Sequence, residues 1–418
     1  MAFDFITSAL DKRRRAGLLR TRHTIDSATG PLIEIDGMHY INFSSNDYLA
    51  MRRSSVVAQA WVDGISEYGA GSGASPLVTG YTKAHQALEE YLACELKRDK
   101  VLLFNSGFAA NQAVCQALFN RDVFNRAIKV QATCKNSHAK NENLIIADKL
   151  MHASFIEGAQ ASSAKLTRFK HNSIEHLQML VNRIDHSQSK NILIATEGVF
   201  SMDGDQAPLR DIVVMSQQAS AWLMVDDAHG FGTLGKHGNG VIETHNLSQQ
   251  QVPIVMATFG KAVGTAGAFV AGSHDFIDYL INFSKHYIYS TAMPAAQAYA
   301  TLISLQATQS AQRRAQLGER IKLFKSLVNK AGLTLMPSNT AIQPLLIGNA
   351  QKALSASEKL KSLGLWVTAI RYPTVPKHTD RLRVTITAGH EVRDIEALVD
   401  ALQIVLLDDQ KGLRGAVN

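Results

Sequence analysis

The sequence contains few cysteines and no long apolar run. Cys94, Cys115 and Cys134 are its only cysteines, and no two of them form a C-x-x-C pair. Structural disulfides and a zinc site are therefore not expected. No apolar segment approaches the roughly 18 residues that a membrane-spanning helix needs, and the first residues lack the apolar core of a signal peptide. We expect a cytoplasmic protein with no membrane span and no metal site.

The charge is basic but is not concentrated in one segment. The formal net charge is +7, from 43 Lys and Arg against 36 Asp and Glu. This balance favours an anionic partner. The basic residues are scattered, however, and none of the basic motifs with interleaved aromatics that nucleic-acid-binding proteins carry is present. A phosphorylated cofactor, coenzyme A or an acidic carrier protein explains the charge equally well, so charge alone does not decide.

From about residue 100, short apolar runs alternate with helical patterns, which is typical of an α/β domain. The chain of 418 residues is long enough for two or three domains. Polar residues that can take part in catalysis or binding come directly after the apolar runs. These positions are the carboxyl ends of the expected strands, where open α/β sheets bind ligands. The expected strands cover residues 101–104, 144–148, 191–196, 222–226, 253–258 and 267–272.

The two ends of the chain differ from its middle. Residues 1–20 predict an amphipathic helix whose basic cluster faces solvent, and Asp36-Gly37 predicts a hairpin turn between residues 32–35 and 40–43. A long helical stretch over residues 295–330, with a break near Gly318, leads to a small α+β domain. Its strands are expected near residues 333–336, 342–347, 365–370 and 381–387, and its helices near 351–363 and 392–407. We therefore expect three parts, at residues 1–45, 46–290 and 291–418.

Two of the expected strands end in an unusual combination of side chains. Asp226 and His229 follow one strand, and Thr258 and Lys261 follow the next. A lysine amine can form a Schiff base, and a carboxylate can hold a ring nitrogen protonated; pyridoxal phosphate (PLP) needs both. Each residue alone has an ordinary interpretation, as a cap, a turn histidine or a surface amine. Together, at one sheet edge, they indicate a PLP site.

Two further groups come after strands of the same sheet. Residues 101–104 run into Ser106, Gly107 and Phe108, which open a helix; free backbone N–H groups and the helix dipole make such a turn a phosphate site. The turn could equally be an ordinary connection from a strand to a helix. His152 follows the strand at 144–148 and could stack on a flat ring, or serve only as a helix cap or a core histidine.

These stretches resemble the α-oxoamine synthases, a family of fold type I PLP-dependent enzymes. The motifs are Thr-Phe-Gly-Lys at 258–261, Val-Asp-Asp-Ala-His-Gly at 225–230 and Ser-Ser-Asn-Asp-Tyr-Leu at 44–49, supported by residues 105–112, 197–205, 289–291 and 366–376. The resemblance covers nearly the whole chain. It implies a large, mostly parallel seven-stranded sheet domain with helices on both faces, plus a small α+β C-terminal domain.

The resemblance also implies roles for single residues. Lys261 would bind PLP covalently and remove the α-proton of the substrate, and Asp226 would pair with the pyridine nitrogen. His152 would stack on the ring, while His229 and Ser201 would bond around the ring oxygen. The phosphate would be held by Gly107, Phe108 and Thr258, with help from Ser290 or Thr291 of the partner subunit in a homodimer. The substrate contacts would be Arg371 on the amino-acid carboxylate, Arg20 and Thr374 on the acyl group, and Asn46.

Within the family, the match is closest to the biotin-pathway members. These condense L-alanine with pimeloyl-CoA or pimeloyl-acyl-carrier protein and release carbon dioxide; the sequence does not choose between the two thioesters. The nearest rival hypothesis is a member that joins glycine to acetyl-CoA, although residues 366–376 and Arg20 favour the longer acyl chain. Two hypotheses from different functional classes are a basic nucleic-acid-binding protein that retains the fold and an inactive regulatory paralogue. The retained Lys261, Asp226, His152 and His229 count against the inactive paralogue.

The sequence departs from the family pattern in two places. About 20 extra residues stand between residues 122 and 143, where we expect a surface insertion that leaves the site intact. In addition, Pro76 follows the Gly-rich loop at residues 69–75, where the family has a less restrictive residue.

Overall fold

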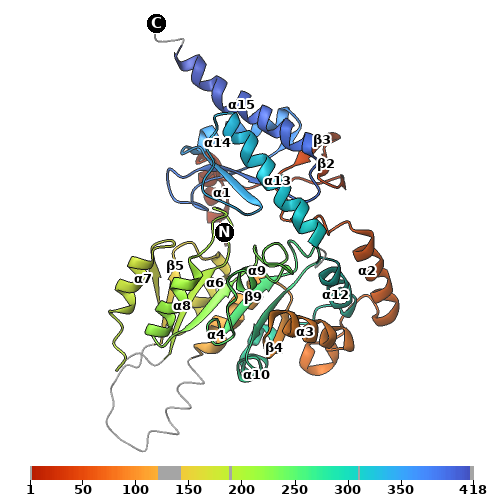
Figure 1. Cartoon of the computed structure of the whole chain (residues 1–418), viewed down its shortest axis with the longest axis vertical. Coiled ribbons are helices and arrows are strands. Elements are labelled where there is room, and N and C mark those ends of the chain that lie inside the picture. The colour runs from red at the N-terminus through yellow and green to blue at the C-terminus, as the bar shows by residue number, and fades with distance from the viewer. Residues whose placement is uncertain (1, 121–142, 188–190, 309–310, 415–418) are drawn as a thin grey trace, which may run out of the picture.

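The computed structural model describes residues 2–120, 143–187, 191–308 and 311–414 (Figure 1). The predicted insertion therefore lies outside the described residues, apart from Asn143. A large body carries the central sheet, and a smaller body with β2, β3, α14 and α15 lies against it (Figure 1). None of the helices in the described part of the chain combines the length and apolar content that crossing a bilayer requires.

The central sheet has seven strands in the order β4-β10-β9-β8-β7-β5-β6. β10 runs antiparallel to both of its neighbours, and the other pairs are parallel, as the predicted mostly parallel sheet requires. One strand, β6, was not predicted, because its Lys-Leu-Thr-Arg-Phe sequence is half polar and lies at the sheet edge. The strands are β4 (Lys100–Phe104), β5 (Leu144–Asp148), β6 (Lys165–Phe169), β7 (Ile192–Glu197), β8 (Trp222–Asp226), β9 (Ile254–Thr258) and β10 (Ala268–Gly272).

Each face of the central sheet builds its own core. Val101 and Leu103 of β4 pack into the cluster that includes α3 and α8, whereas Leu102 and Phe104 pack into the cluster that includes α4, α6 and α10. This alternation is what a strand covered on both sides produces. The helices are α3 (Lys83–Leu96), α4 (Gly107–Leu118), α6 (Ala153–Ala161), α7 (Ile174–Val181), α8 (Leu209–Gln218), α9 (Gly240–His245), α10 (His274–Phe283) and α11 (Lys285–Ile288).

The N-terminal segment joins the small body. The hairpin of β2 (Leu32–Ile35) and β3 (Met38–Asn42) is confirmed, with Asp36 at φ 52° and Gly37 at φ 73°, as a tight hairpin turn needs. β1 (Ser27–Thr29) extends this sheet on one side and β12 (Leu365–Trp366) on the other. The first helix, α1 (Phe5–Arg15), is shorter than predicted, because Gly17 at φ 64° turns the chain away soon after Arg15.

Two helices replace the predicted broken helix at 295–330. α12 (Ala295–Thr308) packs beside α2 (Ser55–Tyr68), and α13 (Ala311–Lys330) follows it (Figure 1). The expected break near Gly318 is wrong. Gly318 lies inside α13, and a Cβ there would have open space around it, so this glycine occupies an open helix position and does not interrupt the helix.

The C-terminal domain is α+β, but two of its strand predictions are wrong. Residues 333–336 form no strand; they follow Gly332, which has φ 72°, and precede Pro337. The expected strand at 365–370 is divided, because β12 pairs with β3 while β13 pairs with β14. The elements of this domain are β11 (Ile342–Leu346), β13 (Thr368–Ile370), β14 (Arg381–Thr385), α14 (Ala350–Ser362) and α15 (Val392–Arg414).

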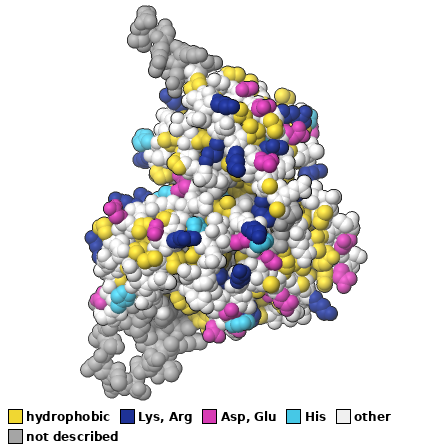
Figure 2. All heavy atoms as spheres, in the orientation of Figure 1, with side chains coloured by type: hydrophobic (Ala, Val, Ile, Leu, Met, Phe, Trp, Pro, Cys, Tyr) yellow, Lys and Arg dark blue, Asp and Glu magenta, His cyan; other side chains and the backbone are white. Residues whose placement is uncertain are grey.

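Charged side chains are mixed on the surface. On the face shown in Figure 2, Lys and Arg are interspersed with Asp and Glu over both bodies and form no continuous basic stripe. A stripe of this kind is the usual electrostatic footprint of a nucleic-acid-binding protein. This face therefore gives no support to the nucleic-acid-binding hypothesis.

Candidate active site

The predicted acid and lysine meet at the carboxyl edge of the central sheet. Asp226 ends β8 and pairs in register with Glu197, the last residue of β7, and with Met256 of β9, which continues two residues further to Thr258. Lys261 follows β9 in a turn closed by the Gly264 N–H, which donates to the Lys261 carbonyl. Neighbouring strands thus deliver both groups to one edge, as the sequence predicted.

Lys261 lies against His229. Its Nζ is 2.8 Å from Nε2 of the imidazole. Burial lowers the pKa of Lys261 to about 8, although the carboxylates of Asp226 and Glu197 oppose the shift. Burial, with the positive charges of Lys261 and Arg383 nearby, holds the pKa of His229 well below its usual value. The site therefore holds an amine that is partly unprotonated near neutral pH beside a neutral imidazole.

A buried chain of hydrogen bonds connects Asp226 with His152. Asn111 Nδ2 donates to Asp226 Oδ2 and to Ser154 Oγ, both at 2.9 Å. Ser154 Oγ is 2.7 Å from His152 Nδ1, and because it accepts from Asn111 it has its own proton to donate there. Burial lowers the pKa of His152, so a neutral ring suits this bond. His152 is also the N-cap of α6, so its role as a cap is compatible with its predicted role beside the ring.

The predicted phosphate turn lies beside Thr258. Ser106 caps α4 and accepts from the Ala109 N–H at 3.1 Å, and Gly107 and Phe108 stand in the first turn, where helix geometry leaves N–H groups without intrahelical acceptors. A Cβ on Gly107 would lie 3.9 Å from the Thr258 Cβ, so the turn and β9 are in contact. Asn105 Nδ2 also donates to the Thr291 carbonyl at 2.7 Å, which brings the 290–291 segment to the same place.

Arg383 is a site residue that the sequence reasoning missed. It comes from β14 and is 7% exposed. Its Nε donates to the Ser201 carbonyl at 2.7 Å and its Nη2 to Asn46 Oδ1 at 3.1 Å. The signal was present in the sequence, since Arg381 and Arg383 lie on one face of a strand in a packed domain, where an unpaired charge is costly.

Three other residues, Arg371, Arg20 and Thr374, were predicted to contact the substrate. Arg371 Nη1 donates to the Gly17 carbonyl at 2.6 Å, which joins the Arg371 loop to the segment that follows α1. Arg20 and Thr374 are exposed. Within the described residues, no hydrogen bond connects any of the three to Lys261 or His229. Their substrate roles stay predictions.

Comparison with known proteins places the chain in a family. A family model for aminotransferase class I and II matches residues 38–402. The curated 8-amino-7-oxononanoate synthase of Aeromonas hydrophila subsp. hydrophila is 44% identical over 408 residues, which cover 97% of this chain and 96% of that protein. The 8-amino-7-oxononanoate synthase of Vibrio atlanticus is 45% identical over 95% of this chain and 92% of that protein. The chain belongs to the 8-amino-7-oxononanoate synthase family.

Solved structures agree with this membership. A serine palmitoyltransferase from S. paucimobilis, whose structure holds PLP, superposes with a TM-score of 0.85 at 25% identity and covers 96% of this chain and 97% of its own. An 8-amino-7-oxononanoate synthase from Francisella tularensis superposes with a TM-score of 0.73 at 30% identity, over 89% of this chain and 99% of its own. As a family member, the chain is a fold type I, PLP-dependent acyltransferase of biotin biosynthesis, which confirms the resemblance seen in its motifs.

The residues at the sheet edge fit the PLP of this family. The donor set comprises a lysine amine, a buried carboxylate, a histidine and the free N–H groups of a helix N-terminus. Within the described residues, two buried side-chain oxygens of the site, Asn111 Oδ1 and Glu197 Oε1, have no hydrogen-bond partner. Buried polar atoms without hydrogen-bond partners are uncommon in protein cores and are typical of sites that hold a ligand or water.

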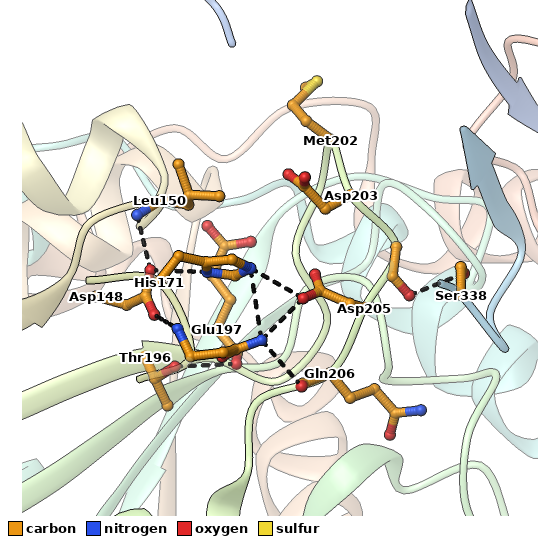
Figure 3. Close-up of polar contacts among 12 residues, drawn as sticks. Asp148, Leu150, His171, Thr196, Glu197, Met202, Asp203, Asp205, Gln206 and Ser338 are labelled. Atoms are coloured by element: carbon orange, nitrogen blue, oxygen red, sulfur yellow. Dashed lines mark hydrogen bonds and ion pairs between the residues drawn. The ribbon is translucent and has the colours of Figure 1, made fainter. Parts of the chain in front are cut away.

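A second network holds the loop that carries Ser201. Figure 3 shows His171 between Asp148 and Asp205, with Nδ1 3.1 Å from Asp148 Oδ1 and Nε2 2.9 Å from Asp205 Oδ2. Asn172 Nδ2 adds a bond to Asp205 at 2.8 Å. Burial alone would lower the pKa of His171, but the two carboxylates raise it to about 10. The imidazolium therefore ties the loop after β7 to the ends of β5 and β6.

This network makes a stability prediction with a defined pH dependence. His171→Gln should destabilise the fold by about 3 kcal/mol at pH 6, because it leaves two carboxylates without their cation. The pKa of His171 is higher in the folded protein than in the unfolded chain. Its contribution to the free energy of unfolding is therefore complete below about pH 6.5 and is lost as the pH rises through about 10. Urea unfolding of both proteins at about pH 6 and about pH 9.5 should show the difference shrinking; an unchanged difference would count against a charged His171.

Proposed function

We propose that this chain condenses L-alanine with a pimeloyl thioester, with loss of carbon dioxide, to form 8-amino-7-oxononanoate. Either coenzyme A or an acyl carrier protein serves as the thiol carrier, and the reaction takes place in the cytoplasm. The names of the relatives at 44% and 45% identity support the substrates. The observation that carries the chemistry is the Lys261 amine, 2.8 Å from the neutral His229 imidazole at the edge that also holds Asp226.

Each residue at this edge of the sheet has a role that its chemistry suits. Asp226, fixed by Asn111 and by the Ala228 N–H at 3.1 Å, stabilises a positive ring nitrogen. PLP, when bound, supplies the electron sink for the charge that develops at the α-carbon of alanine. Lys261 holds the cofactor and then serves as the base, for which a pKa of about 8 is well placed near neutral pH. His152 covers the ring, and the first turn of α4 binds the phosphate.

We further propose that Arg383 receives the alanine carboxylate, beside or in place of the predicted Arg371. Arg383 is buried, and its charge acts on the pKa of both Lys261 and His229, which supports a guanidinium close to the reacting groups. Its Nη1 donates to Thr385 Oγ1 at 3.0 Å, so the group is held firmly. A guanidinium offers a carboxylate two parallel hydrogen bonds, which a lysine cannot.

The two arginines can be separated by kinetics. Arg383→Lys should raise the KM for alanine by about tenfold, since the charge stays but the paired hydrogen bonds are lost. Arg371→Lys, in the loop that follows β13, is the matched comparison and should change the alanine KM by less than about threefold. Initial rates measured at varied alanine concentrations give the KM of each variant. A larger effect at Arg371 would show that Arg371, and not Arg383, binds the carboxylate.

We also propose a homodimer in which Ser290 and Thr291 serve the partner's site. Asn105 holds this segment beside the phosphate turn of its own chain, and the neighbouring Tyr289 is 78% exposed. A large exposed aromatic beside such a turn favours a protein interface. Mixing a Lys261→Ala chain with a Ser290→Ala/Thr291→Val chain tests this. If the segment serves the partner, mixed dimers regain one intact site and activity returns; if it serves its own chain, none returns.

A single assay tests the proposed function. Carbon dioxide release and product mass are measured with L-alanine or glycine, each paired with pimeloyl-CoA, pimeloyl-acyl-carrier protein or acetyl-CoA. The expected result is turnover with alanine and a pimeloyl thioester, and the faster of the two pimeloyl donors identifies the preferred carrier. Faster turnover of glycine with acetyl-CoA would contradict the proposal.

A further inference from the structure

Tyr48 connects the N-terminal motif to the reacting lysine. It follows β3 in the Ser-Ser-Asn-Asp-Tyr-Leu stretch, and its side chain is fully buried. The phenol oxygen is 2.6 Å from His229 Nδ1, and His229 Nε2 is 2.8 Å from Lys261 Nζ. Three side chains from three distant segments thus form one line that ends at the amine.

The chemistry of the neighbours sets the direction of these hydrogen bonds. Burial raises the pKa of Tyr48 to about 12, so the phenol keeps its single proton at neutral pH. A second acceptor within reach of that proton is Asn46 Oδ1, but at 3.3 Å this is a longer and weaker contact than the 2.6 Å to His229 Nδ1. The shorter contact is therefore satisfied when Tyr48 donates to His229 Nδ1.

A neutral imidazole carries one proton, on one of its two nitrogens. His229 is neutral because burial and the charges of Lys261 and Arg383 lower its pKa. When Nδ1 accepts from Tyr48, the single proton must lie on Nε2. That nitrogen faces Lys261, so the ring presents an N–H donor to the unprotonated form of the amine, which a pKa of about 8 makes accessible, and to the group that the amine binds.

We propose that Tyr48 is a positioning residue that fixes the His229 proton on Nε2 and thereby directs an N–H donor to the reacting centre. Without the phenol, Nδ1 becomes a buried acceptor with no donor, and the ring is free to move its proton or to turn. The effect on catalysis rests on the proposed function, in which Lys261 is the reacting amine; the effect on the His229 ring does not depend on it.

The test is Tyr48→Phe in the full-length holoenzyme, with the histidine ring nitrogens labelled with ¹⁵N. The resonances of His229 are assigned by their loss in His229→Gln. In the unaltered protein we expect an unprotonated, hydrogen-bonded Nδ1 and a protonated Nε2. In Tyr48→Phe the Nδ1 resonance should move, because its donor is gone. We expect kcat to fall by about tenfold to a hundredfold and the alanine KM to change by less than about threefold, the range for an unsatisfied buried acceptor.

Tyr91→Phe is the matched control, because the Tyr91 hydroxyl is buried and has no hydrogen-bond partner in the described residues. It should leave both the His229 resonances and kcat unchanged. Thermal unfolding and visible cofactor absorbance confirm that each variant is folded and loaded. Unchanged His229 resonances in Tyr48→Phe, or an unchanged kcat, would overturn the proposal. The resonances remain informative even if alanine proves not to be the substrate.

Discussion

Replacing Lys261 with alanine is expected to abolish turnover and to remove the visible absorbance of the covalently held cofactor. Among the described residues, Lys261 is the lysine that stands just after β9, 2.8 Å from His229 and near the carboxyl groups of Asp226 and Glu197, so no other described lysine can take its place. Under the proposed function, the variant loses the nucleophile that holds PLP and the base that moves the α-proton. We expect kcat to fall by at least about ten-thousandfold, the combined effect of losing covalent and general-base catalysis.

Absorbance spectra and single-turnover assays check this result. The matched control is Lys330→Ala, which removes an exposed lysine at the end of α13. It should keep the spectrum and the rate. The fold should survive in Lys261→Ala, because removing an amine that is costly to bury does not take away apolar packing. A Lys261→Ala protein with a normal spectrum and normal turnover would contradict the assignment.

Replacing Asp226 with asparagine is expected to have the second-largest effect. The change keeps the shape of the side chain and removes its charge, so under the proposed function the positive ring nitrogen loses its partner. We expect kcat to fall on the order of a thousandfold, typical of removing a preorganised electrostatic contact. The amide would also face the Asn111 Nδ2 donor at 2.9 Å, so the buried chain to Ser154 must rearrange.

The comparison variant for this position is Asp226→Glu, which keeps the charge and displaces it. It should retain more activity than Asp226→Asn if charge dominates, and less if geometry dominates. Stopped-flow measurement of α-proton exchange from deuterated alanine isolates the step in which the ring nitrogen matters. Equal exchange rates in Asp226→Asn and the unaltered protein would show that this carboxylate does not support the ring.

Much of the site could be predicted because its residues are placed by local rules. Strands with continuous apolar runs end where polar residues begin, and parallel strands share their carboxyl edge, so Asp226 and Lys261 were expected to meet. The hairpin could be predicted because its turn requires two residues with positive φ, a conformation that the pair Asp36-Gly37 favours and adopts. These features depend on a few neighbouring residues and on general topology.

The errors come from contacts between distant segments. Residues 365–370 form two short strands instead of one, because β3 pairs with Leu365 and Trp366 while β14 pairs with residues 368–370. Arg383 and Tyr48 meet the site only when the small body packs against the large one, so their local sequence does not show which site they join, even where, as at Arg383, it marks a buried charge. His171 likewise becomes charged through Asp148 and Asp205, which lie 23 and 34 positions away in the chain.

The proposed chemistry depends on Lys261 as the residue that binds the cofactor. Borohydride reduction of the holoenzyme converts the carbon–nitrogen double bond between cofactor and lysine into a stable single bond, and peptide mass mapping then locates the label. The expected result is one pyridoxyl phosphate group per chain, on the peptide that contains Lys261. A label on another lysine, or a protein that takes up no label, would contradict the assignment of the active site.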